Sequence, residues 1–143
     1  MKRILLTLAL GTAVVVAAAI SFAHTDDHGE GVKVVSNYDI KEKLDGKDSA
    51  VTVVEVTIEP GQQGVPHRHP GPAFVYVVEG EYELGIDDQP TKRFKAGETF
   101  YEPAGCLHRV SKNPSDKGRT RLIATLVHPR DAKEIAIPEP TEK

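Results

Sequence analysis

Residues 61–73 read GQQGVPHRHPGPA and run directly into the apolar stretch FVYVVE at residues 74–79, which ends at Gly80. His67 and His69 are two positions apart in this segment. Side chains alternate between the two faces of an extended chain, so both imidazole rings leave the same face if the segment is a strand. The segment therefore predicts a strand that presents two histidines to one point.

A second stretch carries another histidine. Residues 97–108 read GETFYEPAGCLH, so His108 comes directly after a Pro-x-Gly turn. The chain then alternates towards Val110, which is typical of the start of another strand. A neighbouring strand can supply a third imidazole to the pair at His67 and His69. We therefore predict one metal ion bound by these three histidines.

The two stretches together resemble the paired motifs of the cupin superfamily. The first motif, G-x5-H-x-H-x3-E-x6-G, is matched by Gly61, His67, His69 and Gly80, and the second, G-x5-P-x-G-x2-H-x3-N, by Gly97, Pro103, Gly105 and His108. The resemblance covers roughly residues 32–130, and paired motifs of this spacing are more specific than either alone. It implies a small single-domain cupin in which the histidines hold a metal inside a barrel.

Two positions depart from the motifs. Ala73 stands where the metal-binding Glu is expected, and it has no donor atom. The final Asn of the second motif comes one residue late, at Asn113 instead of Lys112.

Strand signals recur at short intervals along the rest of the chain. They cover residues 32–35, 50–58, 74–78, 81–86, 94–101, 107–110 and 122–127, and are separated by Gly, Pro and Asp turns. Many short strands with such turns predict an all-β sandwich or barrel. The resemblance narrows the fold to a single jelly-roll β-barrel.

The first 23 residues have the layout of a secretory signal peptide, with a basic start, an apolar run over residues 4–20 and small residues at positions 21 and 23. An uncleaved membrane anchor is the alternative, because an apolar core of 17 residues is at the lower edge of what spans a bilayer. The A-x-A-like site favours cleavage. We therefore expect an exported protein, periplasmic or secreted, that begins at His24 and keeps no stable membrane span.

Cleavage would remove Lys2 and Arg3 and leave 16 Lys and Arg against 21 Asp and Glu, a net charge of -5. This mild acidity, with dispersed basic residues, gives no support for nucleic-acid binding. We expect a mobile leader at residues 24–31, the cupin domain at residues 32–130 and a tail at residues 131–143 that adds an edge strand. The resemblance also implies a homodimer formed through such edges.

Three imidazoles suit a divalent transition ion, and we expect one Fe, Zn, Cu or Ni ion. With three protein ligands and Ala73 in the fourth place, two or three coordination positions stay open, as a catalytic metal needs. The missing carboxylate argues against manganese.

Other side chains near the motifs have two interpretations each. The single cysteine, Cys106, is either a small residue in a turn, which we favour, or a thiol close to the metal. His24 with His28 is either part of a solvated tail, which we favour, or a copper site at a new N-terminus. Gln62, Gln63, Tyr101 and Glu102 could reach the metal, but we interpret each as an ordinary surface residue at a strand end.

Two function classes follow. The first is a metal-dependent enzyme of oxygenase or isomerase type that acts on a small organic molecule. The alternative is a module that binds a small molecule or a metal without chemistry. Catalytic residues are not identified, because the sequence has no Ser-His-Asp order, no second carboxylate pair, no phosphate loop and no clear general base.

Overall fold

The computed structural model describes residues 30–140, so the predicted signal peptide, His24 and His28 lie outside the described residues. The described part contains ten strands and no helix. They are β1 (Glu30–Leu44), β2 (Lys47–Ile58), β3 (His67–Arg68), β4 (Ala73–Glu79), β5 (Glu81–Ile86), β6 (Lys92–Lys95), β7 (Thr99–Glu102), β8 (Leu107–Lys112), β9 (Thr120–Pro129) and β10 (Ile137–Pro138). Accordingly, residues 30–140 hold no helix long and apolar enough to cross a membrane.

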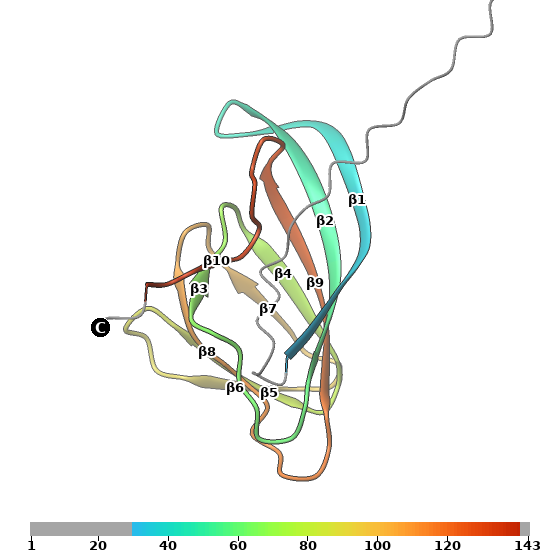
Figure 1. The fold of residues 1–143 in the computed structure, drawn as a ribbon, viewed down its shortest axis with the longest axis vertical. Helices are drawn as coiled ribbons and strands as arrows, with labels where there is room; N and C mark the ends of the chain where they lie inside the picture. The colour runs from blue at the N-terminus through green and yellow to red at the C-terminus, as the bar shows by residue number, and fades with distance from the viewer. Residues whose placement is uncertain (1–29, 141–143) are drawn as a thin grey trace, which may run out of the picture.

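The strands form two antiparallel sheets of five (Figure 1). The first has the order β1-β2-β9-β4-β7 and the second the order β10-β3-β8-β5-β6. One buried apolar cluster joins them, with Val54, Val75 and Leu126 from the first sheet and Tyr82 and Leu84 from the second. This arrangement confirms the all-β jelly roll, although the two sheets are not hydrogen-bonded into one closed barrel.

Strand β4 alternates as its sequence predicts. Ala73, Val75 and Val77 are buried, whereas Phe74 and Tyr76 are exposed on the outer face. The inward residues therefore form part of the core between the sheets.

The predicted strand signals differ from the structure at two places. Strand β1 runs from Glu30 to Leu44 because it pairs with β2 along its length, so Glu30 and Gly31 belong to a strand and not to the leader. The signal at residues 94–101 is divided by a turn at Gly97, which has a φ of 91°. Strands β6 and β7 on either side of this turn lie in different sheets.

A β-bulge in β8 explains why Asn113 comes late. Ile86 pairs with His108 and Gly85 with Val110, so Arg109 is an extra residue in β8. A bulge shifts the alternation of side chains by one position. Asn113 is therefore buried although it stands five residues after His108 instead of four.

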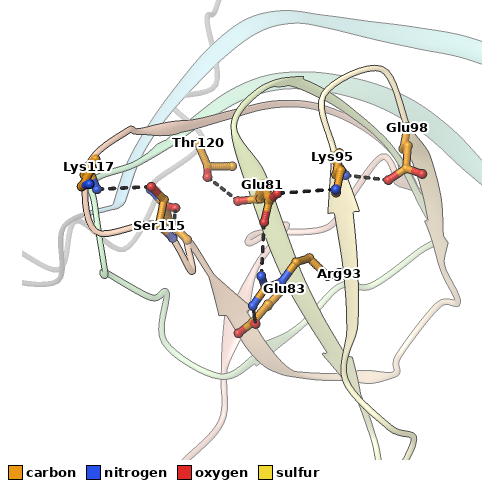
Figure 2. A network of polar contacts seen from close by, with 9 residues as sticks. Glu81, Glu83, Arg93, Lys95, Glu98, Ser115, Lys117 and Thr120 are labelled. Carbon is orange, nitrogen blue, oxygen red and sulfur yellow. Dashed lines mark hydrogen bonds and ion pairs between the residues drawn. The ribbon is translucent and has the colours of Figure 1, made fainter.

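The outer face of the β5–β6 hairpin carries an ion-pair network (Figure 2). Arg93 bridges Glu81 and Glu83, at 3.3 and 2.6 Å, and Lys95 lies 3.9 Å from Glu81. The Arg93 and Lys95 side chains are more than half exposed, so solvent screens these pairs. The network stabilises the hairpin modestly.

Candidate metal centre

The structure brings the three predicted histidines together. His67 in β3 and His108 in β8 are direct partners across the second sheet, and His69 follows one residue after β3. One nitrogen from each ring lies within 4.8 Å of the others. His67 Nε2 is 3.2 Å from His69 Nε2 and 3.3 Å from His108 Nδ1. Two nitrogen ligands about 2.1 Å from a tetrahedral metal lie roughly 3.4 Å apart, so the separation of His67 Nε2 from His69 Nε2 suits a shared ion.

Backbone carbonyls fix the tautomers of two of the rings. His67 Nδ1 bonds to the carbonyl of Val65 at 2.7 Å, and His69 Nδ1 bonds to the carbonyl of Ile135. A carbonyl oxygen only accepts, so each Nδ1 carries the proton and each Nε2 of a neutral ring presents a lone pair. Metal-ligating histidines are commonly oriented in this way.

Burial keeps these two rings neutral. It lowers the pKa of His67 to about 4, with His108 and His69 adding to the effect. Burial also lowers the pKa of His69, against the opposing influence of Glu102. At neutral pH two lone pairs therefore face each other at 3.2 Å with no proton between them. A cation between the nitrogens would turn this repulsion into attraction.

Glu102 in β7 also belongs to the cluster. Its side chain points inward with only 2% of the residue exposed, and its carboxylate lies 3.1 Å from His108 Nε2 and 3.4 Å from His69 Nε2. Burial raises the pKa of Glu102, but His108, then His69 and His67, outweigh burial and hold this pKa below its usual range. The carboxylate is therefore ionised at neutral pH.

One nitrogen in the cluster has no hydrogen-bond partner. Among the buried side-chain nitrogen and oxygen atoms of residues 30–140, only His108 Nε2 lacks a hydrogen-bond partner. It is close to Glu102, yet the approach does not meet hydrogen-bond geometry. Native structures leave few such atoms unsatisfied, and a cation bound at this nitrogen would satisfy it.

The interpretation of Glu102 as an ordinary surface residue is wrong. Thr99, Phe100, Tyr101 and Glu102 alternate along β7, so Glu102 shares the inward face with Phe100. Tyr101 is 52% exposed, as expected for a surface residue. The alternation from Phe100 was the available signal, but a charged residue next to a turn suggested solvent.

The remaining candidates lie outside the cluster. Gln62 and Gln63 are exposed, and within residues 30–140 neither side chain hydrogen-bonds to a histidine. Cys106 is half-buried in the turn before β8 and is not part of the cluster, which agrees with a small turn residue. Burial, followed by Glu102 and Asp87, raises the pKa of its thiol.

A surface hollow of about 510 Å³ lies elsewhere on the molecule. Its lining comprises Gln63, Glu83, Thr91, Lys92, Arg93, Val110 and Lys112, and it contains none of the three histidines. The hollow is open and mainly polar, so the chemistry of the donor atoms, and not the hollow, identifies the site.

Residues 54–126 match the family described as "Cupin domain". The comparison with curated proteins finds no match.

Similar solved structures include a conserved protein with a double-stranded β-helix domain from Klebsiella pneumoniae subsp. pneumoniae, which is 22% identical with a TM-score of 0.58 over 80% of this chain and 88% of that one. An RmlC-like cupin from Shewanella frigidimarina is 23% identical with a TM-score of 0.56, covering 78% and 91% of the two chains. A recombinant oxalate oxidase in complex with glycolate is also 23% identical with a TM-score of 0.56, covering 78% of this chain and 55% of that one. Identities this low establish the fold alone.

Proposed function

Because this chain belongs to the cupin family, whose domain spans half of it, we propose that it is an exported protein that binds one divalent transition metal ion and acts on a small organic molecule. The observation that carries the proposal is the convergence of His67 Nε2 and His69 Nε2, 3.2 Å apart, on two rings whose Nδ1 atoms bond to backbone carbonyls. His108 completes the set of three imidazoles.

The residues present fit a metal. Two of the imidazoles are oriented by carbonyls, and the unpartnered His108 Nε2 lies beside an ionised carboxylate. Neutral imidazoles suit Fe, Zn, Cu or Ni. When bound, such an ion would supply Lewis acidity or a centre for oxygen activation. The protein orients the donor rings and surrounds them with a largely buried shell.

An enzyme is favoured over a binding module. A structural zinc is normally closed by four protein ligands. Three histidines alone leave at least one coordination position of the metal open, and an ion that takes six ligands keeps two or more open even if the neighbouring carboxylate also binds. A substrate could occupy these positions. A binding module remains the second candidate, because Ala73 replaces the family's usual carboxylate.

Metal content tests the first part of the proposal. We expect the mature protein, purified from its native compartment, to contain close to one Fe, Cu, Ni or Zn ion per chain. A His67→Ala, His69→Ala variant should contain none, and His128→Ala is a matched control because His128 is a buried histidine outside the cluster. A metal-free wild-type protein that takes up no added ion would refute the proposal.

Turnover tests the second part. The metal-loaded protein should consume oxygen or convert substrate on a panel of phenols, enols and keto acids. Oxalate and glycolate belong on this panel because an oxalate oxidase shares the fold. Tight binding of a panel member without turnover would favour the binding module.

Export and assembly complete the proposal. Mass spectrometry of protein from the periplasm or the medium should find His24 as the first residue. The exposed outer-face side chains of Phe74 and Tyr101, whose rings lie 5.4 Å apart, support a homodimer that covers them. A Phe74→Lys, Tyr101→Lys variant should be monomeric by light scattering. A monomeric wild-type protein would contradict the dimer.

A further inference from the structure

Ala73 and Glu102 are direct partners across the β4–β7 pairing. Directly opposite residues of an antiparallel pair point to the same face, with Cβ atoms about 5 Å apart. Both residues are inward, and Ala73 is 1% exposed. The carboxylate missing from the strand at position 73 is therefore present on the adjacent strand, directed into the same space.

The two oxygens of this carboxylate lie beside the rings of two of the three histidines. One oxygen lies 3.4 Å from His69 Nε2, whose ring already donates through Nδ1 to Ile135. The other lies 3.1 Å from His108 Nε2, outside hydrogen-bond geometry. The carboxylate therefore reaches within 3.4 Å of a ring nitrogen of both His69 and His108, as a donor that shares one cation with these rings would.

We propose that Glu102 is the fourth protein ligand of the metal and replaces the carboxylate that Ala73 cannot supply. This inference rests on the proposed metal site and changes its composition, from three imidazoles to three imidazoles and one carboxylate. The added oxygen donor also removes the argument against manganese, because carboxylates suit that ion. The small side chain at position 73 leaves room for the longer one from β7.

The alternative is that Glu102 only orients His108 from outside the metal's coordination sphere. Loss of such an outer partner typically weakens metal binding about 10–100-fold. Gln at position 102 would keep an accepting oxygen for His108 and would preserve much of this orienting effect. If Glu102 is a ligand, removing its side chain breaks a bond to the metal and weakens binding more strongly. Gln at position 102 then also fails to preserve binding, because a neutral amide is a weak substitute for a carboxylate ligand.

Cobalt(II) binding distinguishes the two roles. We would titrate the metal-free full chain with Co²⁺ and record both the dissociation constant and the visible absorption spectrum, which reports the donor set. Glu102→Ala and Glu102→Gln should each weaken binding by more than 100-fold and change the spectrum. Glu83→Ala is the control, since Glu83 pairs with Arg93 on the outer face, and it should leave both readouts unchanged.

Exchanging the two positions gives the decisive variant. An Ala73→Glu, Glu102→Ala protein keeps one carboxylate in the same space, and it should recover Co²⁺ affinity to within about tenfold of wild type. Circular dichroism checks folding of each variant, and recovery in the exchanged protein is the supporting result even if Glu102→Ala alone unfolds. A wild-type spectrum retained in Glu102→Gln, or no recovery in a folded exchanged variant, would overturn the role of Glu102 while leaving the three-histidine site intact. A wild-type chain that binds no Co²⁺ would overturn both.

Discussion

His69 is held by the C-terminal segment through a hydrogen bond from its Nδ1 to the carbonyl of Ile135. The Ile135 side chain is 3% exposed and belongs to the core cluster. Two residues further on, β10 pairs with β3. Arg68 then binds Glu139 through two hydrogen bonds, at 3.0 and 3.3 Å. The segment after β9 therefore orients a candidate metal ligand.

Truncating the Ile135 side chain should affect both stability and metal binding. We expect Ile135→Ala to lower the free energy of unfolding by about 2–5 kcal/mol, because it leaves a cavity in the core. The carbonyl that orients His69 would lose its anchor, so metal affinity should fall about tenfold. Urea denaturation and Co²⁺ titration measure the two effects.

Ile137 provides the matched control for this prediction. It has the same side chain in the same segment but is 45% exposed. Ile137→Ala should change stability by less than about 1 kcal/mol and leave metal affinity unchanged. If Ile135→Ala and Ile137→Ala changed metal affinity equally, the packing of the Ile135 side chain in the core would not be what orients His69.

The metal-free protein should lose stability as the pH falls from about 6.5 to about 4. Burial lowers the pKa of His67 to about 4, so in this window the unfolded chain binds a proton that the folded chain excludes. Stability then decreases with falling pH, by about 2 kcal/mol between pH 7 and pH 5 from His67 alone. Urea denaturation in the presence of a chelator measures this loss.

A His67→Gln variant isolates the contribution of this ring. It cannot titrate, so the loss between pH 7 and pH 5 should shrink by about the same 2 kcal/mol. The remaining loss includes His69, whose pKa is also lowered by burial. An identical pH profile for wild type and variant would mean that His67 is not buried in its neutral form.

The fold was predictable because its signals are local. Alternation in β4 and β5, and turn residues such as Gly97, each lie within a few residues of the structure that they determine. The three histidines were also predictable, since their spacing within two short segments sets their direction. The metal-site prediction itself awaits the measurements above.

Pairing between distant strands set the features that were not predictable. The inward position of Glu102 follows from its alternation with Phe100, but its relation to Ala73 depends on the register of β4 with β7. The contact of His69 with Ile135 joins residues 66 positions apart. The late Asn113 depends on the bulge at Arg109, which becomes visible only when β8 is paired with β5.

Asn113 should be a strong determinant of stability with no role in metal binding. It is fully buried, and its Nδ2 donates to the carbonyls of Ile58 and Gly118, at 3.0 and 2.8 Å. Its Oδ1 accepts the backbone N–H of Ser115 at 2.9 Å. Asn113→Ala leaves these backbone groups without partners, and each buried unpaired group costs about 1–3 kcal/mol. We expect a loss of roughly 3 kcal/mol or more by urea denaturation, with the metal content per folded chain unchanged.

Asn37 is the control for Asn113. It is exposed and makes one side-chain hydrogen bond, from Nδ2 to Thr52 Oγ1 at 2.6 Å. Asn37→Ala should cost about 1 kcal/mol or less. If Asn113→Ala were as mild as this control, water would have to replace all three bonds.

Gly71 should be required both for folding and for the position of His69. A Cβ at this residue would stand 1.8 Å from the carbonyl oxygen of Val127 and 2.9 Å from its carbon, both backbone atoms of β9. The loop cannot move away freely, because Val127 N donates to the Pro72 carbonyl at 3.0 Å. We expect Gly71→Ala to destabilise the protein by at least about 3 kcal/mol and to weaken Co²⁺ binding in the folded fraction.

Gly118 supplies the matching substitution, because a Cβ there meets no atom closer than 4.0 Å. Gly118→Ala should therefore be neutral, or stabilising by up to about 1 kcal/mol through the smaller entropy of the unfolded chain. Thermal and urea denaturation of both variants, followed by Co²⁺ titration, would separate the effects. A Gly71→Ala protein with wild-type stability and affinity would show that the loop after His69 can leave β9 without disturbing the site, and that the ring is held by the Ile135 carbonyl alone.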